Sequence, residues 1–331
     1  MQAKKGTVRQ RPYLYLILYG MFGEKSTVFP FRAALYFSPG SAIMETTTHI
    51  EKGALSMTPT TVWAAWFSAT DTTKQVVTTI AQRLADRLGV PVQTHDFTLP
   101  QVRKAGPKTF GPGDLVVFGT PVYAGRVPNL LIKYVAAVRG TGAVAVPVVC
   151  YGNRAYDDAL MELTRTLEAG GLTTLAAAAF SCQHAFSDTQ NAGRPDVSDL
   201  TIAKGFADAA WRKLRAAGAL AALAPVAVPG NDPVGPYYTP RDRHGNPIDI
   251  LKVRPKTSDA CHKCGKCAKL CPLGSIDADD PTQVSKCMKC NRCVRHCPRH
   301  AKYFDDPNYL YHKTELEDQF SWPRKGPELF L

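Results

Sequence analysis

Eight cysteines in two runs of identical spacing constrain this sequence more than any other feature. The first run is Cys261-His-Lys-Cys264-Gly-Lys-Cys267-Ala-Lys-Leu-Cys271-Pro272. The second is Cys287-Met-Lys-Cys290-Asn-Arg-Cys293-Val-Arg-His-Cys297-Pro298. Both follow C-x2-C-x2-C-x3-C-P, and the second begins 26 residues after the first. Thiols at this density indicate ligands to a metal centre, or else disulfides.

The spacing favours iron–sulfur ligation over a single ion. In this pattern, three cysteines of one run hold a [4Fe–4S] cluster, and the fourth binds the other cluster. The proline after the fourth cysteine suits a turn, because its φ is already restricted. The pattern therefore predicts two clusters with crossed ligands. Set one is Cys261, Cys264, Cys267 and Cys297, and set two is Cys287, Cys290, Cys293 and Cys271.

Zinc and disulfides explain the pattern less well. A structural zinc site usually uses two C-x2-C pairs, and it leaves no role for a third cysteine followed by Cys-Pro. A disulfide framework suits small secreted domains, whereas 331 residues can bury a large core without one. The cysteine usage therefore favours a reducing compartment, and we expect a cytoplasmic protein. Cys150 and Cys182 lie in apolar segments and are expected in the core.

The formal net charge of +12 raises the possibility of nucleic-acid or membrane-surface binding. Residues 252–302 hold 12 Lys/Arg against 4 Asp/Glu, and the basic residues are interleaved with the cysteines. Two clusters with four thiolates each would offset part of this excess, since each carries a formal charge of about −2 when oxidised. We therefore expect the basic surface to dock an acidic redox protein and not a nucleic acid.

Residues 1–56 differ from the rest of the chain. The apolar run at residues 13–22 is too short for a membrane span, which needs about 20 residues. A basic segment precedes it, as in a signal peptide, but no small-x-small cleavage site follows. We expect residues 1–56 to be a poorly structured extension, with Met57 as a natural start, and we expect no membrane span.

Strands alternate with helices in residues 57–223. Strands are predicted at residues 62–67, 92–97, 114–118, 144–150 and 173–180. Helices are predicted from about residue 76 to a stop at Gly89, at 127–138, at 154–169, and from an N-cap at Ser198 to 220. This alternation predicts an α/β fold, a doubly wound parallel sheet with helices on both faces.

The remainder of the chain is expected to form three further parts. Residues 224–259 are rich in Pro, Gly and Asp, which predicts an extended connector. Residues 260–302 are expected to form a small α+β domain around the clusters. Residues 303–331 carry so many aromatic side chains that we expect this tail to pack back on a domain.

Three loops follow strands of the predicted sheet, at the edge where parallel sheets bind ligands. Residues 68–73 join a strand to a helix N-terminus, and their hydroxyl and N–H groups form a natural phosphate site. Residues 120–128 and 151–156 follow the third and fourth strands. Tyr123 and Tyr156 can flank a planar ring, although each alone would be read as an ordinary amphipathic residue.

The loop in WFSATDTTKQ resembles the S/T-x-T-G-x-T loop with which flavodoxins grip the FMN phosphate. With FGTPVYAGRVP, CYGNRAYDDAL, the VPGNDP connector and the cysteine runs, residues 60–330 resemble fusions of a flavodoxin-like domain with a dicluster ferredoxin. The resemblance implies FMN, with phosphate contacts from Ser68, Thr70, Thr72 and Thr73. It implies ring contacts from Pro121, Val122, Tyr123, Ala124, Gly125, Gly152, Asn153 and Tyr156.

Asp71 departs from the flavodoxin pattern, which has Gly at this position, and Ala69 replaces a second common Gly. Gly permits a left-handed backbone, which Asp tolerates better than most residues. The Asp71 carboxylate would, however, repel a phosphate dianion a few ångströms away. FMN binding therefore requires this carboxylate to point away from the phosphate, toward water.

We expect an electron-transfer protein that passes single electrons between two [4Fe–4S] clusters and FMN. One alternative is a flavin-dependent oxidoreductase that reduces a small molecule at FMN. The other is a ferredoxin whose flavin-free domain docks a partner. No nucleophile or acid–base pair is evident, so no catalytic residue is predicted. His184, His262 and His296 are isolated in the sequence, and packing or surface roles are expected for them.

Overall fold

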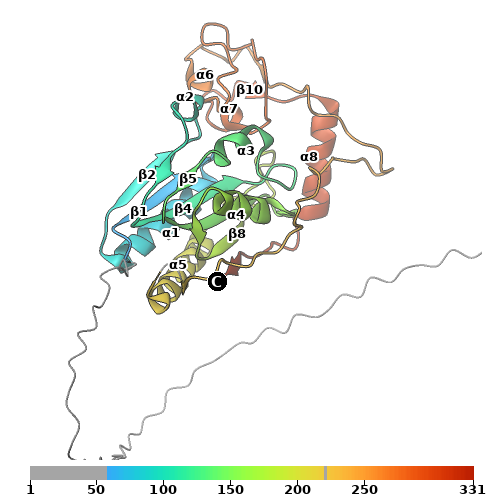
Figure 1. The fold of residues 1–331 in the computed structure, drawn as a ribbon. Coiled ribbons are helices and arrows are strands. Elements are labelled where there is room, and N and C mark those ends of the chain that lie inside the picture. Colours follow the sequence, from blue (N-terminus) through green and yellow to red (C-terminus); the bar gives the residue numbers. More distant parts are fainter. Residues whose placement is uncertain (1–57, 220–221) are drawn as a thin grey trace, which may run out of the picture. The chain divides into compact units, whose positions relative to one another are not determined.

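Five parallel strands form the centre of the sheet in the computed structural model, which describes residues 58–219 and 222–331 (Figure 1). They are β1 (Thr61–Trp66), β2 (Val92–Asp96), β4 (Asp114–Pro121), β6 (Val144–Tyr151) and β8 (Ala177–Ser181). Their order is β2-β1-β4-β6-β8, and all four pairings are parallel. Taken in chain order this is 2-1-3-4-5, the flavodoxin-like order of doubly wound sheets. The predicted extension at residues 1–56 lies outside the described residues.

Short strands complete the sheets. β7 (Thr173–Thr174) pairs with β6, and β3 (Thr109–Phe110) pairs with β5 (Arg139–Gly140). β11 (Glu328–Phe330) runs antiparallel along β8 and covers that edge of the main sheet. A segment about 150 residues further along the chain thus occupies the edge beside β8, which would otherwise present unpaired backbone groups.

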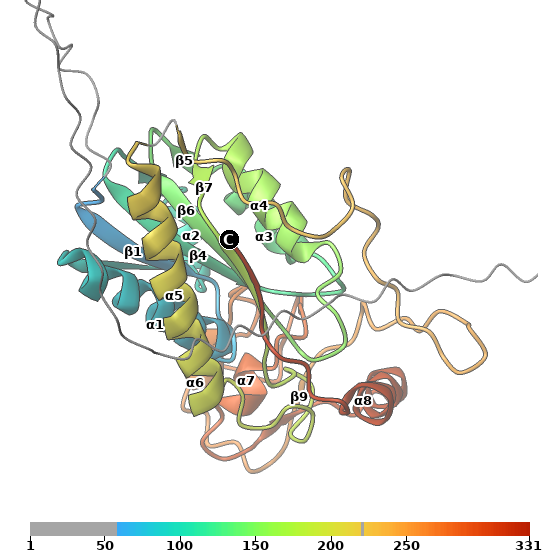
Figure 2. The ribbon, with the colours of Figure 1, turned by 90° about the horizontal axis from the view of Figure 1, so that it is seen from below.

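Helices cover both faces of the sheet (Figure 2). On one face, α1 (Thr72–Leu88) and α5 (Val197–Ala217) pack against alternate residues of β1 such as Val62 and Ala64. On the other, α3 (Asn129–Val135) and α4 (Ala159–Ala169) form a second core with Ala65. Successive residues of a strand point to opposite faces, so one buried strand serves both cores. The short α2 (Pro100–Lys104) follows β2.

Helix ends agree with the sequence in one case and differ in others. Gly89 ends α1 in the left-handed conformation, as predicted. The prediction of Ser198 as an N-cap is wrong, because the Asp196 side chain accepts from the N–H groups of Ser198 and Asp199 in a capping box. The helix predicted from residue 154 begins only at Ala159. The strand predicted at residues 173–180 is divided into β7 and β8.

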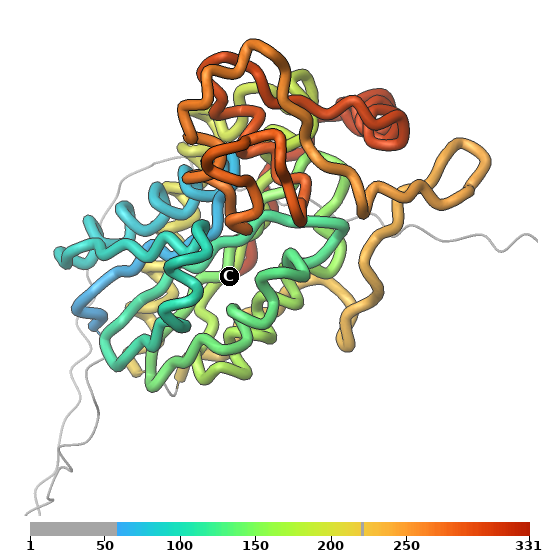
Figure 3. Tube along the Cα trace, turned by 90° about the horizontal axis from the view of Figure 1, so that it is seen from above, coloured from blue at the N-terminus to red at the C-terminus, as the bar shows by residue number. Residues whose placement is uncertain are grey.

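Residues 260–302, here called the cysteine region, lie on the side where the parallel strands end (Figure 3, orange). The region contains α6 (Lys266–Leu270) and α7 (Arg292–Arg295). β9 (Lys256–Thr257) and β10 (Lys302–Tyr303) form an antiparallel pair at its two ends. The chain continues into α8 (Pro307–Phe320) and β11. Among the helices of the described residues, none has the length and apolar character that crossing a bilayer requires.

Candidate functional site

The two cysteine runs share one backbone conformation. Left-handed residues recur at an interval of 26 residues in three pairs. These are Lys263 and Lys289 (φ 55° and 54°), Gly265 and Asn291 (71° and 57°), and Gly274 and His300 (61° and 50°). The cysteine region is therefore an internal duplication, and α6 corresponds to α7.

Backbone N–H groups point at the thiols with the same periodicity. The N–H groups of Lys263 and Lys289 lie 3.4 and 3.3 Å from the sulfur atoms of Cys261 and Cys287. Ser275 and Ala301 contact Cys271 and Cys297 at 3.4 and 3.2 Å in the same way. Such donors stabilise negative charge on sulfur, which suits thiolate ligands.

Two small cavities lie within the cysteine region, and each is lined by four cysteines. One holds Cys261, Cys264, Cys267 and Cys297, and the other holds Cys271, Cys287, Cys290 and Cys293. The structure thus brings together three cysteines of one run with the fourth of the other, around each cavity.

All ten cysteines are free. Within residues 58–219 and 222–331, no three His, Cys, Asp or Glu side chains are placed to hold a single metal ion. A lone zinc ion draws its thiolates to about 2.3 Å. A four-iron cluster instead binds each thiolate through a separate iron atom and so needs wider spacing. Four thiols line each cavity, which is the number of ligands that a [4Fe–4S] cluster takes.

Set two is more deeply buried than set one. Burial raises the pKa of Cys290 to about 12 and also raises the pKa of Cys287 and Cys293. Cys264, the counterpart of Cys290 in set one, is exposed to solvent. The thiols of the second run are therefore covered by the rest of the protein to a greater extent than those of the first run.

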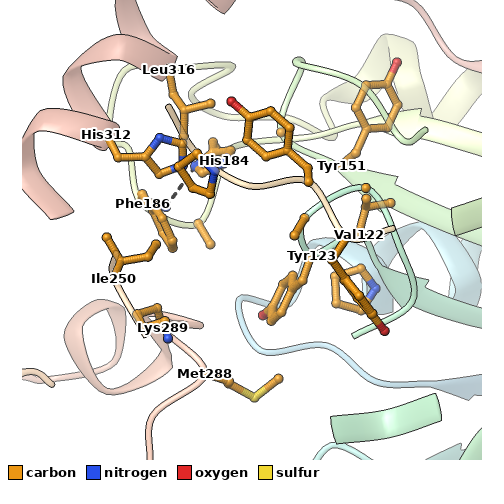
Figure 4. Close-up of a pocket in the computed structure, with 18 of the residues that line it drawn as sticks. Val122, Tyr123, Tyr151, His184, Phe186, Ile250, Met288, Lys289, His312 and Leu316 are labelled. Carbon is orange, nitrogen blue, oxygen red and sulfur yellow. Dashed lines mark hydrogen bonds between the residues drawn. The ribbon is translucent and has the colours of Figure 1, made fainter. Parts of the chain in front are cut away.

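A large cavity of about 730 Å³ lies at the carboxyl edge of the main sheet (Figure 4). This volume lies within the range of roughly 300–1,000 Å³ that is usual for ligand sites. Its walls come from the loops after β1, β4, β6 and β8, from the connector, from α8 and from the second cysteine run. The sequence-predicted residues that line it are Thr70, Thr72, Thr73, Pro121, Val122, Tyr123, Ala124, Gly125 and Gly152.

The loop after β1 presents a helix N-terminus to this cavity. Ser68 does not line the cavity, because its buried hydroxyl accepts from the N–H of Lys74 at 3.1 Å. Thr70, Thr72 and Thr73 do line it, where the 17-residue α1 begins without a side-chain cap. The helix dipole and these hydroxyls favour an anionic group at this end of the cavity.

Asp71 has the left-handed conformation that the flavodoxin pattern assigns to Gly, with φ 64°. Its carboxylate lies 3.2 Å from Nε2 of His296 and 3.7 Å from Nη1 of Arg292. Burial and the neighbouring Arg292 lower the pKa of His296, so Arg292 supplies the positive charge. Arg292 also donates to the backbone oxygens of Ser68 and Ala69, both at 2.8 Å. The carboxylate thus faces the cysteine region, and Asp71 does not line the cavity.

Asn153 and Tyr156 lie outside the cavity and hold the C-terminal segment. The Asn153 side chain donates to the Pro323 oxygen at 3.1 Å and accepts from the Lys325 N–H at 2.9 Å. The Tyr156 hydroxyl donates to the Glu328 carboxylate at 2.7 Å. These partners lie about 170 residues away in the chain, so no local sequence pattern could have indicated them.

Gly152 is required by a close approach. A Cβ atom at this position would lie 2.0 Å from Cδ2 of His184. The histidine ring can therefore pack against the loop after β6 only because that position has no side chain. This contact brings His184 into the wall of the large cavity.

One end of the cavity was not predicted from the sequence. His184, Phe186, His312 and Leu316 lie together there, away from Tyr123 (Figure 4). Burial lowers the pKa of His184 to about 3 and that of His312 to about 4, so both rings are neutral near pH 7. Nδ1 of His184 accepts from the N–H of Phe186 at 3.1 Å, which leaves the ring proton on Nε2. The sequence feature that pointed toward this end of the cavity was the aromatic content of the tail, which contributes His312 and Leu316.

The connector forms another wall of the cavity. Tyr237 and Tyr238 line it, and their rings stack beneath the guanidinium groups of Arg126 and Arg154 at 4.9 and 4.1 Å. The buried Asp158 accepts from the N–H of Gly235 at 2.7 Å and so attaches the connector to the start of α4. The first half of the connector, residues 226–238, is therefore hydrogen-bonded to the flavodoxin-like part.

The large cavity adjoins set two directly. Leu273, Lys286, Cys287 and Met288 line both the large cavity and the smaller cavity of set two. Tyr123 lines the large cavity, and its burial, followed by the neighbouring Cys290 and Cys287, raises its pKa. One layer of side chains therefore separates the two cavities.

No protein-family model and no curated protein matches this sequence. Among solved structures, the chain is similar to a Streptococcus pneumonia TIGR4 flavodoxin, with 18% identity, 47% of this chain and 98% of that chain covered, and a TM-score of 0.33. Flavodoxin 1 from Bacillus cereus is 15% identical, with 46% of this chain and 97% of that chain covered, and its TM-score is 0.34. The flavodiiron protein from Giardia intestinalis is 16% identical, with 49% of this chain and 37% of that chain covered, and its TM-score is 0.30. The flavodoxin-like fold is assigned here from the strand order.

Proposed function

We propose that this protein is a cytoplasmic electron-transfer protein with two [4Fe–4S] clusters and one FMN. Set one and set two would each hold a cluster, and the large cavity would hold the flavin. The partner would be an acidic redox protein. Bound FMN would exchange one or two electrons, whereas each cluster would exchange one.

The observation that carries this proposal is the shared wall between the large cavity and set two. Leu273, Lys286, Cys287 and Met288 line both spaces. Side chains in van der Waals contact with both cofactor sites are what a single-electron relay requires. Cys290 and Cys293 of set two are buried behind this wall.

The residues around the cavity support FMN in one orientation. Thr70, Thr72 and Thr73 at the start of α1 would hold the phosphate, since no carboxylate of that loop lines the cavity. Residues 121–125 and Gly152 would then lie along the ring, with Tyr123 on the side of set two. Arg292 offsets the Asp71 charge that would otherwise oppose the phosphate.

Anaerobic expression followed by cofactor analysis tests the proposal. We expect about eight iron, eight sulfide and one FMN per chain, with electron paramagnetic resonance signals of reduced [4Fe–4S] centres. Iron at this level without flavin would remove the flavin half and favour a partner-docking role for the flavodoxin-like part. Zinc without sulfide would contradict the cluster assignment.

A second candidate function is the reduction of a small molecule at the flavin. The observation that favours it is the apolar space at the His184 and His312 end, which lies beyond the ring loops. The test is flavin reoxidation by a panel of quinones and nitroaromatic compounds. Leu316→Trp should fill this space and slow such reoxidation, while reduction by dithionite stays unchanged. If every compound reoxidises both proteins at equal rates, the small-molecule reductase function is contradicted, and the electron-carrier function is the one that remains.

A further inference from the structure

We propose that the half of the cysteine region around set one is a docking surface for an acidic redox protein, with Lys266 and Lys269 as its central contacts. This inference rests on the proposed electron-transfer function. It follows from comparing the two halves of the duplication, one of which is already docked on the flavodoxin-like part.

The inward half docks through two arginines of α7. Arg292 donates from Nη1 to the backbone oxygens of Ser68 and Ala69 at 2.8 Å. Arg295 donates from Nη2 to the backbone oxygens of His184 and Ser187 at 3.0 and 2.5 Å. The second run thus offers two cations on one helix to acceptors on the loops after β1 and β8.

The outward half offers the same two positions without partners. Lys266 and Lys269 of α6 lie 26 residues before Arg292 and Arg295, and both are exposed. Within residues 58–219 and 222–331, neither ammonium group makes a hydrogen bond or an ion pair with another residue. Arg292 and Arg295 thus bind the flavodoxin-like part, whereas Lys266 and Lys269 are exposed and have no acceptor among the described residues.

Other differences between the halves agree with this assignment. Leu273 lines the large cavity, whereas its counterpart Arg299 is exposed. Cys290 is buried, whereas its counterpart Cys264 is exposed. A charged, exposed residue and an accessible thiol therefore lie beside set one, where set two has an apolar residue of the cavity wall and a buried thiol.

The charge of this surface identifies the chemistry of the partner. Lys263 and Arg299 add to Lys266 and Lys269, and the cysteine region holds three acidic residues, Asp277, Asp279 and Asp280. Oppositely charged surfaces steer the association of electron-transfer proteins and orient them. A protein with carboxylates around its own redox centre would place that centre beside set one. An exposed thiol next to the lysines adds no contact that binds nucleic acid, because such binding rests on phosphate–cation contacts.

The test compares Lys266→Gln/Lys269→Gln with a control of equal charge change, Lys204→Gln/Arg212→Gln, on the exposed face of α5. Iron, sulfide and flavin are measured first, so a failure of the proposed function is seen separately. Calorimetric titration with an acidic plant-type ferredoxin should give binding about tenfold weaker for the α6 variant at low salt. The control should bind like the parent protein. The difference should vanish in 0.5 M salt, at a Debye length of roughly 4 Å.

Small ions give a second readout. Reduced holoprotein is mixed with ferricyanide, which takes one electron and becomes ferrocyanide, or with hexaamminecobalt(III), which takes one electron and becomes cobalt(II). The α6 variant should react several-fold more slowly with the anion and faster with the cation, and the control should not change. Unchanged binding and unchanged rates in a cofactor-replete α6 variant would overturn the inference. So would loss of duplex DNA binding in that variant with ferredoxin binding intact, because the patch would then serve a nucleic acid.

Discussion

Lys302 and Ile276 occupy equivalent positions in the duplicated cysteine region, and both are buried, with 2% and 7% of their surface exposed. Lys302 lines the cavity of set one, and Ile276 lines the cavity of set two. The Lys302 ammonium donates to the Thr257 hydroxyl at 2.7 Å and to the Pro281 oxygen. Set one thus has a buried positive charge where set two has a methyl group.

This difference predicts unequal reduction potentials. A fixed cation stabilises the more negative, reduced state, so Lys302→Met should lower the potential of the cluster at set one by on the order of 50–100 mV. The exposed Lys269→Met should shift either potential much less, because solvent screens it. Redox titration followed by electron paramagnetic resonance measures both. Identical titration curves for Lys302→Met and the parent protein would contradict the prediction.

The crossed cysteine sets predict which double variants keep iron. Cys264→Ala/Cys297→Ala removes two ligands of set one, so about four iron atoms per chain should remain. Cys290→Ala/Cys297→Ala removes one ligand from each set, so iron should fall to nearly none. Iron and sulfide analysis of anaerobically purified proteins decides between the two. Uncrossed ligation would give the opposite result.

The contact of Arg292 with the loop after β1 predicts a difference from Lys266. Arg292→Ala removes two charged hydrogen bonds to backbone oxygens and should lower the free energy of unfolding by on the order of 2–4 kcal/mol. Lys266→Ala, at the equivalent exposed position, should change it by less than about 0.5 kcal/mol. Anaerobic urea unfolding, followed by tryptophan fluorescence and by cluster absorbance, measures both. Equal destabilisation would show that the two halves are anchored alike.

The pairing of Asp71 with Arg292 predicts a thermodynamic cycle for FMN affinity. Arg292→Gln should weaken FMN about tenfold, because the Asp71 carboxylate is then uncompensated near the phosphate. Asp71→Asn should change affinity by less than tenfold, and the double variant should recover most of the loss. Quenching of FMN fluorescence on titration gives the constants. Additive losses in the double variant would mean that the two residues act independently.

The buried histidines predict a loss of stability in mild acid. The folded pKa values of about 3 for His184 and about 4 for His312 lie below the usual 6.5. Burial opposes the charged form of each ring, and the positive charge of Arg154 lowers both pKa values further. Their contribution to stability is therefore complete above about pH 6.5 and falls as pH decreases toward 4, by up to about 1.4 kcal/mol per pH unit for each group.

Thermal unfolding between pH 7 and pH 5 measures this dependence. His312→Asn should flatten the curve relative to the parent protein, because one of the two depressed groups is gone. His262→Asn, at an exposed position, should leave the curve unchanged. A curve of the same slope for all three proteins would show that these histidines do not control acid stability.

Local patterns in the sequence sufficed for most of the strands, the C-terminal end of α1 and the cysteine spacing, whereas α1 begins at Thr72 and not at about residue 76. Strand alternation and the left-handed Gly89 are properties of short segments, and β1, β4 and β6 begin within one residue of prediction. The N-cap of α5 was misplaced by two residues, because Asp196 and Ser198 are both good caps and only geometry selects between them. Division of one predicted strand into β7 and β8 likewise depends on what each half can pair with.

The cavity walls could not be predicted in the same way. Thr70, Thr72, Thr73 and the loop after β4 belong to strand ends, which strand order brings together. His312, Tyr237 and Cys287 reach the cavity from segments about 110 to 240 residues away from those loops, and their positions depend on tertiary contacts. The contacts of Asn153 and Tyr156 with the C-terminal segment likewise depend on tertiary structure and not on local sequence.

The position of β11 has a mechanical consequence. Because β11 pairs with β8, the chain enters the cysteine region from one part of the sheet domain and returns to another. The region is thus a segment clamped at both ends, and neither end can swing out without breaking strand pairs or the bonds at Asp158. Separating the large cavity from the cysteine region therefore requires breaking the β8–β11 pairs, or else the hydrogen bonds that hold the connector at Asp158.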